Sequence, residues 1–265
     1  MEITVKSIKI NKDEKITFKI PKQEVTALTG TDNSKIINIL RGNIKKISCN
    51  IVYDNTRITK NNQFEIKKLI SYVATDIDIS KQLLKVNEYM LSIFYKTKIQ
   101  IKNPDKKIID SLKIVGLPIS FLKRNINDLS TSEKKLLQVA IALLKNPKII
   151  ILNEPFISLD SKNIKRLIRL LVQLNDKYNI NIIINTKNCE IIYKYIKYVI
   201  IFKNEKVLTC GNSKEVYSQV ELLKSNQIEI PEIVELVYEA KKYKKVMIDY
   251  HRDIRDLIKD IYKHI

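Results

Sequence analysis

The sequence predicts an α/β fold built around a parallel β-sheet, and three observations lead to this prediction. Residues 149–152 are four successive aliphatic residues, a run typical of a parallel strand that is covered on both faces. Residues 25–28 form a second apolar run, followed by a polar loop that contains a glycine and a lysine and then by another apolar segment. Residues 136–144 carry apolar side chains at helical spacing. Strands and helices therefore alternate along the chain.

The stretch from residue 129 to residue 160 holds most of the recognisable motifs. Its polar opening is Leu129-Ser130-Thr131-Ser132-Glu133, and the spacing of Ser130 and Glu133 predicts a helix N-terminus. Asn146-Pro147 ends this helix, and the strand at residues 149–152 runs into Asn153-Glu154-Pro155. Glu154 therefore lies just beyond the carboxyl end of a buried strand, where α/β sheets place their chemistry.

The remaining elements follow from the same two periodicities. Residues 3–10 and 16–20 alternate as an antiparallel hairpin with a polar turn between them. Further strands are predicted at residues 25–28, 69–75, 180–185, 199–202 and 207–210. Residues 76–128 are mostly helical in pattern, and residues 164–174 predict a clean amphipathic helix. A tail from residue 213 adds a helix begun by Pro231 and a last segment at residues 254–261.

The composition argues against a membrane-spanning, a secreted, a metal-binding and a nucleic-acid-binding protein. With 265 residues and 45% hydrophobic content the chain can bury a sizeable core, and no apolar run reaches the length of a membrane span. The N-terminus lacks the apolar block of a signal peptide. Three distant cysteines (Cys49, Cys189 and Cys210) predict reduced thiols, and the sequence shows no metal-binding cluster. The net charge of +19 is spread through every segment, which favours a solvated surface over a nucleic-acid groove.

The order of these parts resembles the ATP-binding subunit of an ABC transporter. That family reads L-S-G-G-Q, a helix, a strand ending Asp-Glu-Pro, and a loop ending Leu-Asp. The same frame aligns here without a gap as LSTSE, VAIALLKNPKIIILNEP and SLD, which ends at Asp160. The two helices of the tail are most similar to the C-terminal extension of the energy-coupling-factor ATPases, which import vitamins and transition-metal ions. A generic amphipathic cap remains an equal interpretation of the tail.

The resemblance implies a P-loop NTPase core of the ABC type with an N-terminal antiparallel β subdomain, a helical subdomain and a C-terminal helical extension. The expected boundaries are residues 1–212 for the ATP-binding domain, with the helical subdomain at about 76–135, and residues 213–265 for the extension. Asp160 would lie in the loop that the family calls the D-loop. ATP and Mg²⁺ are the cofactors that the family implies.

The nucleotide-binding loop departs from the family pattern G-x-x-x-x-G-K-[ST], in which backbone N–H groups surround the phosphates and the hydroxyl binds Mg²⁺. The candidate loop is Gly30-Thr31-Asp32-Asn33-Ser34-Lys35. It is one residue short and lacks the second glycine, and Ile36 replaces the hydroxyl. We interpret it as an eroded P-loop, although an ordinary strand–loop–helix with a chance lysine also fits.

Three other positions where the family places reactive residues are substituted. Thr75 stands where the family has the glutamine that reaches Mg²⁺, and Asn153 replaces the aspartate that orients the metal. Lys187 replaces the histidine that contacts the γ-phosphate. Glu154 alone matches the family's general base. These changes predict that this chain binds the metal poorly and does not hydrolyse ATP at a useful rate in its own site.

The signature segment is expected to serve a partner's nucleotide instead, because ABC subunits bind ATP between one P-loop and the other subunit's L-S-G-G-Q helix. Thr131 and Ser132 replace the two glycines and add Cβ atoms there, so we expect weak support of hydrolysis. The predicted partners are a competent ATPase paralogue and a transmembrane subunit, with this chain held on the cytoplasmic face of the membrane. A functional ATPase with a shortened P-loop and a soluble ABC protein that acts on nucleic acid remain alternatives.

Overall fold

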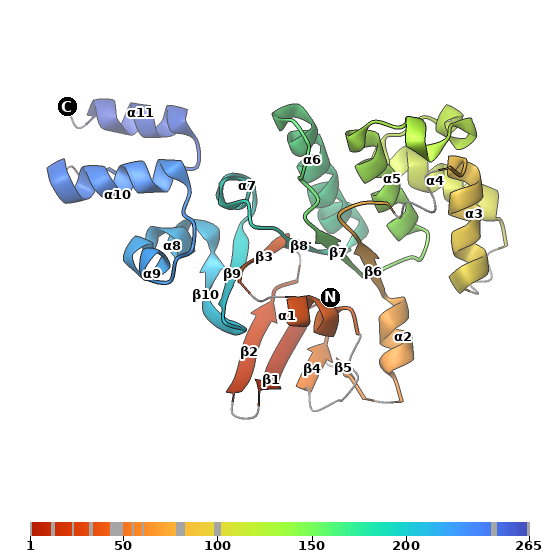
Figure 1. The fold of residues 1–265 in the computed structure, drawn as a ribbon, viewed down its shortest axis with the longest axis horizontal. Helices are drawn as coiled ribbons and strands as arrows, with labels where there is room; N and C mark the ends of the chain where they lie inside the picture. The colour runs from red at the N-terminus through yellow and green to blue at the C-terminus, as the bar shows by residue number, and fades with distance from the viewer. Residues whose placement is uncertain are drawn as a thin grey trace.

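The computed structural model describes residues 2–11, 14–22, 24–31, 34–42, 50–54, 56–59, 61–77, 83–97, 102–244 and 248–263. A six-stranded sheet lies at its centre, in the order β10 (Lys206–Asn212), β9 (Tyr198–Lys203), β3 (Thr26–Gly30), β8 (Asn181–Asn185), β7 (Ile149–Asn153) and β6 (Ile70–Val73). All neighbouring pairs are parallel except β9 and β10, which form a hairpin. The predicted parallel sheet is confirmed (Figure 1).

A second, antiparallel sheet packs against the first. Its order is β2 (Glu14–Ile20), β1 (Ile3–Asn11), β4 (Asn50–Tyr53) and β5 (Thr56–Arg57). The hairpin predicted from alternation is β1–β2, whereas β4 and β5 were not predicted. β4 pairs with β1 from Ile3–Tyr53 to Lys6–Asn50. Ile51, Val52 and Tyr53 favour a strand, but the segment is only four residues long and pairs with residues far away in the sequence.

The aliphatic runs of the central strands are continuous because their two faces meet two different cores. Ile149 and Ile151 of β7 join the cluster shared with the antiparallel sheet, which also contains Ile3, Val5 and Phe18. Their neighbours Ile150 and Leu152 point to the other face, where the helices lie. Successive side chains of a strand point to opposite faces, so a strand buried on both sides needs apolar residues at every position.

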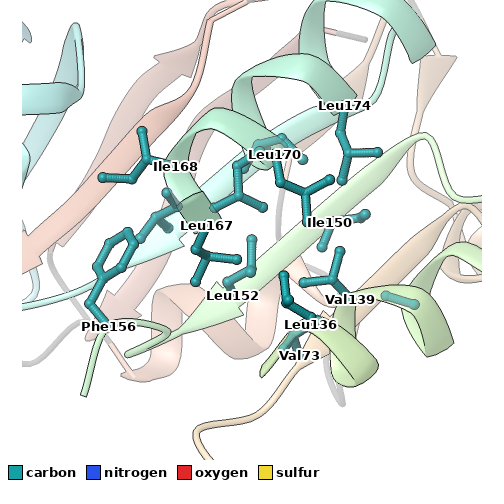
Figure 2. Close-up of a cluster of buried hydrophobic side chains, with 14 of the residues drawn as sticks. Val73, Leu136, Val139, Ile150, Leu152, Phe156, Leu167, Ile168, Leu170 and Leu174 are labelled. Carbon is teal, nitrogen blue, oxygen red and sulfur yellow. The ribbon is translucent and has the colours of Figure 1, made fainter. Parts of the chain in front are cut away.

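Helices α5 (Thr131–Leu143) and α6 (Ser161–Tyr178) supply the second core. Figure 2 shows Ile150 and Leu152 of β7 beside Leu167, Leu170 and Leu174 of α6, with Val139 of α5 at the edge of the group. The amphipathic helix predicted at residues 164–174 is therefore present and lies with its apolar face on the sheet. The other helices are α1 (Ser34–Leu40), α2 (Gln63–Lys68), α3 (Val86–Thr97), α4 (Pro104–Val115), α7 (Cys189–Tyr195), α8 (Ser213–Ser218), α9 (Val220–Ser225), α10 (Glu232–Lys244) and α11 (Ile254–Lys263), with short 3₁₀ turns at Ile119–Lys123 and Ile126–Asp128.

The C-terminal residues divide between two apolar clusters. Helices α8 and α9 contribute Val216, Val220 and Leu223 to the main core, whereas α10 and α11 surround a small cluster of Val237, Ile248 and Leu257. Arg252 joins the two parts through hydrogen bonds to Tyr193 O (3.0 Å), Ile196 O (3.2 Å) and Ser213 Oγ (2.9 Å). The boundary expected at residue 212 stays a prediction. Among the helices that the structure describes, none is long and apolar enough to cross a membrane.

Candidate functional site

The predicted site residues that follow β3, β6, β7 and β8 lie along one edge of the central sheet, where these parallel strands end. Asn153 of β7 is the register partner of Asn185 of β8, and Asn185 is in turn the partner of Leu28 of β3. Two backbone hydrogen bonds continue this contact beyond the strands, from Glu154 N to Asn185 O (2.8 Å) and from Thr186 N to Leu28 O (3.1 Å). The loops after β3, β7 and β8 therefore meet at the same edge, as the parallel order requires.

Both carboxylate oxygens of Glu154 accept hydrogen bonds from the loop after β8. Thr186 Oγ1 donates to Oε2 at 2.8 Å, and the backbone N–H of Lys187 donates to Oε1 at 2.9 Å. The backbone of Glu154 has a φ of 44°, which is uncommon for a residue with a side chain. These contacts orient the carboxylate toward the protein. A general base must reach the water whose proton it removes, and both acceptor oxygens here already have protein donors.

Both the nitrogen and the oxygen of the Asn153 side-chain amide form hydrogen bonds within the protein. Its Nδ2 donates to Thr75 Oγ1 at 3.0 Å, and its Oδ1 accepts from Asn185 Nδ2 at 2.6 Å. Thr75 Oγ1 also lies 3.4 Å from Asn153 O. Three of the strand ends are thus joined by side chains rather than by a ligand. An aspartate at position 153 could not donate to Thr75, so this arrangement depends on the asparagine.

Helix α5 adds two donors to the segment that follows β6. Lys135 Nζ donates to Thr75 O, and Gln138 Nε2 donates to Ala74 O at 3.2 Å. Lys135 is 5% exposed, and burial lowers its pKa, while the nearby carboxylates of Asp76 and Glu154 act in the opposite direction. The buried ammonium therefore provides positive charge beneath this edge of the sheet.

These side chains do not fit the Mg²⁺ ion that the resemblance implies. Mg²⁺ needs an octahedron of oxygen ligands, usually one or two carboxylates with phosphate and water. Asn153 presents a neutral amide whose oxygen already accepts from Asn185, and the two oxygens of Glu154 accept from Thr186 and Lys187. Ile36, at the position of the metal-binding hydroxyl, is fully buried. The residues that the structure describes contain no group of three or more His, Cys, Asp or Glu side chains that could hold a metal ion.

The candidate nucleotide-binding loop begins against the neighbouring strand. Gly30 has a φ of +98°, and a Cβ at this position would lie 1.9 Å from Phe202 O of β9. Thr31 N donates to the same carbonyl oxygen at 2.9 Å, and Asn204 N donates to Thr31 Oγ1 at 3.4 Å. Asp32 and Asn33 lie outside the described residues. Ser34 and Lys35 open α1, whose apolar side Ile36-Ile37 is buried.

A cavity of about 170 Å³ brings two of the predicted segments together. Gly30 and Thr31 line this cavity together with Lys187. The remaining lining residues are Thr29, Cys189, Tyr217, Gln227, Ile228 and Glu229. Lys187 and the start of the eroded P-loop are therefore neighbours, although Lys35 is not among the residues that line this cavity.

The signature segment forms the predicted helix start. Ser130 Oγ accepts from Glu133 N at 3.3 Å, and Glu133 Oε2 accepts from Ser130 N at 2.8 Å, which completes a capping box. Burial raises the pKa of Glu133, but the Ser130 hydrogen bonds and the Arg124 guanidinium outweigh this effect and leave the pKa below its usual value. Asp160 has a similar structural role, because its carboxylate caps α6 by accepting from Asn163 N at 2.8 Å.

Replacing Ser130 with alanine is expected to destabilise the fold by about 1 kcal/mol, because the N–H of Glu133 loses its acceptor. Chemical denaturation of the two proteins measures this difference. Ser132→Ala is a suitable control, since the Ser132 hydroxyl contacts only Ser130 Oγ, at 3.3 Å, among the hydrogen bonds of the described residues. Equal losses in the two variants would contradict the capping role.

Three residues of this edge were not predicted from the sequence. Asn185 repeats the pattern of Asn153, a polar residue that ends a buried strand, and this repetition could have identified it. Lys135 falls among the apolar positions of α5, which is a signal for a buried lysine. Glu205, which pairs with Lys35, lies in the turn of a distant hairpin and carried no signal.

Comparison with known proteins agrees with this geometry. Residues 14–157, more than half of the chain, match the ABC transporter family. The chain belongs to this family. Among individual relatives, the energy-coupling factor transporter ATP-binding protein EcfA2 of Clostridium perfringens is 29% identical over 230 residues, covering 84% of this chain and 79% of that protein. EcfA of Methanocaldococcus jannaschii is 25% identical and covers 94% and 91%.

Solved structures of ABC proteins have the same fold. The structure of cbiO1 from Clostridium perfringens, described as part of the ABC transporter complex cbiONQ, superimposes with a TM-score of 0.72 at 25% identity and covers 89% of this chain and 98% of that one. The ADP conformation of the ATP-binding cassette MJ1267 gives a TM-score of 0.74 at 21% identity, with 86% and 100% covered. The predicted fold class is confirmed, and this chain is an ABC transporter ATP-binding subunit.

Proposed function

We propose that this chain is the ATP-binding subunit of an energy-coupling-factor transporter that imports a micronutrient, and that its own catalytic site is inactive. It would act beside a competent second ATP-binding subunit, on a transmembrane subunit at the cytoplasmic face of the membrane. The named EcfA relatives and the cbiONQ membership of cbiO1 support the type of transporter. They favour it over the nucleic-acid function that the net charge left open.

The observation that carries the inactive site is the closed hydrogen-bond network at the strand ends. Both carboxylate oxygens of Glu154 accept hydrogen bonds from the loop after β8, and Asn153 offers an amide where a metal would need a carboxylate. Phosphoryl transfer depends on positioned charge that compensates the phosphate oxygens. The part of the chain that the structure describes has no group of three or more acidic, His or Cys side chains that could hold the metal ion supplying most of this charge. The substitutions affect residues of the metal and nucleotide site and leave the sheet and the helices in place. This combination is consistent with a subunit that is needed for assembly or for transmitting a conformational change.

The signature segment is the part that can still serve a partner. The Ser130 hydroxyl and the first N–H groups of the 13-residue helix α5 lie at an exposed helix start, where a partner's nucleotide phosphate would be stabilised. Ser130 also keeps its capping role, so its hydroxyl is already oriented. We propose that one of the two composite sites of the dimer, formed by this segment and the partner's P-loop, hydrolyses ATP.

The test is to purify the chain alone and together with an ATP-binding paralogue from the same organism that keeps the full P-loop, and to measure phosphate release with Mg²⁺ and ATP. The isolated chain should release phosphate at the rate of a no-enzyme control, while the mixed complex should be active. Recovery with membranes is expected only when a transmembrane partner is co-expressed. Robust Mg²⁺-dependent hydrolysis by the isolated chain would overturn the inactive site.

A further inference from the structure

The lysine of the eroded P-loop has a partner within its own chain. Lys35 Nζ lies 2.5 Å from Glu205 Oε1. Glu205 belongs to the turn between β9 and β10, 170 residues further along the sequence, so the contact depends on the fold. The Lys35 side chain is 58% exposed and that of Glu205 is 16% exposed. The lysine therefore extends over the surface toward a mostly buried carboxylate.

The backbone around Glu205 fixes the position of this carboxylate. Asn204 and Glu205 have φ values of 49° and 62°, the left-handed conformation of a tight two-residue hairpin turn. The same turn is joined to the loop after β3, because Asn204 N donates to Thr31 Oγ1 and Phe202 O accepts from Thr31 N. The turn and the start of the loop thus form one hydrogen-bonded unit, which places Glu205 beside α1.

The position of Lys35 on α1 accounts for its direction. Successive helical residues are separated by about 100° around the helix axis. Ile36 and Ile37 occupy the buried side of α1, and Lys35 is left at the side that faces the hairpin. In a P-loop of full length the lysine meets phosphate oxygens, whereas here it meets a carboxylate oxygen.

The ion pair with Lys35 involves only one of the two carboxylate oxygens of Glu205. Its second oxygen, Oε2, is buried and has no hydrogen-bond partner within the described part of the chain. A buried carboxylate with one unsatisfied oxygen depends strongly on its remaining cation, because leaving the charge without Lys35 would be costly. A phosphate that approached Lys35 would have to compete with this carboxylate and would also be repelled by it.

We propose that Glu205 is an internal ligand of Lys35 that excludes nucleotide phosphate from the eroded P-loop. This inference rests on the P-loop assignment within the proposed function, and adds to it a residue that blocks the site. The P-loop of this chain has therefore lost residues that bind nucleotide and has also gained an ion pair, in which Glu205 is the anion that contacts Lys35. Removing that anion should restore part of the affinity for polyphosphates without restoring hydrolysis.

The experiment measures binding of ATP and of inorganic tripolyphosphate to the full chain at low ionic strength, with EDTA and with Mg²⁺. Glu205→Gln keeps the size of the side chain and removes its charge. Glu65→Gln is the matched control, because Glu65 forms a similar 2.8 Å ion pair with Lys68 at an exposed site on α2. Lys35→Ala and the Lys35→Ala/Glu205→Gln double variant complete the series, and circular dichroism confirms that each variant folds.

Glu205→Gln is expected to bind both probes about tenfold more tightly than the wild type, the effect of removing one close like charge, while Glu65→Gln stays unchanged. The double variant should lose the gain. Equal affinity of Glu205→Gln and the wild type, including no binding by either, would overturn the role of Glu205, and so would a gain that persists without Lys35. Phosphate release from the mixed complex tests the proposed function separately, because it depends on the partner's P-loop.

Discussion

In a complex with a competent ATPase, Glu154→Gln in this chain is expected to leave phosphate release within about twofold of the wild-type rate. The reason is that Asn153 and the buried Ile36 stand at two positions where the family binds the metal, so a base at Glu154 has no metal-bound phosphate beside it. Thr186 and Lys187 also hold the Glu154 carboxylate against the protein. Glutamine keeps one acceptor oxygen at this position, and the complex should still assemble. Gel filtration with the partner establishes assembly before any rate is compared.

The same substitution at the partner's strand-end glutamate is expected to lower phosphate release at least about a hundredfold, the usual contribution of a general base. The comparison is therefore between two chemically identical changes in the two subunits of one complex. A large loss from Glu154→Gln would show that Glu154 leaves its protein donors in the assembled state. The inactive site would then be wrong, although the family and the fold would be unaffected.

Much of the central sheet could be predicted because burial on both faces leaves a direct trace in the sequence. β7, β8 and β9 each carry an unbroken aliphatic run, and the polar residue that ends each run marks the edge of the sheet. β4, β5 and α2 left no such trace, since each is short. β5 is a two-residue strand held only by pairing to β4. Such elements depend on long-range partners, which local sequence does not encode.

The candidate site also has features that the sequence predicts and features that it does not. The position of Glu154 followed from the end of its own strand, but its hydrogen bonds to Thr186 and Lys187 depend on a loop 32 and 33 residues away. The metal-binding positions could be recognised as substituted from residue type alone. What the replacements do instead could not be predicted, because Asn153 and Asn185 end two strands and Thr75 follows a third. Side-chain networks between strands become visible only when the sheet order is known.

Gly30 joins the sheet and the nucleotide-binding loop, and its replacement is expected to have the largest effect on stability. Gly30→Ala should destabilise the fold by about 4 kcal/mol. Part of this comes from the φ of +98°, which disfavours any residue with a Cβ. The larger part is steric, since the new Cβ would lie 1.9 Å from Phe202 O, an atom of the backbone that pairs β9 with β3. The two strands would have to separate.

Gly42→Ala separates these two contributions. Gly42 also has a positive φ, +74°, but a Cβ there would lie no closer than 3.7 Å to the side chain of Lys67, an ordinary contact. This variant should therefore lose only about 1 kcal/mol, the conformational cost of a side chain in the left-handed region. Urea unfolding of both variants and the wild type gives the difference from the midpoints, provided that the slopes agree. Equal losses would mean that the backbone at Gly30 relaxes away from Phe202. The contact of Thr31 with the β9–β10 turn would then not be a fixed feature of the fold.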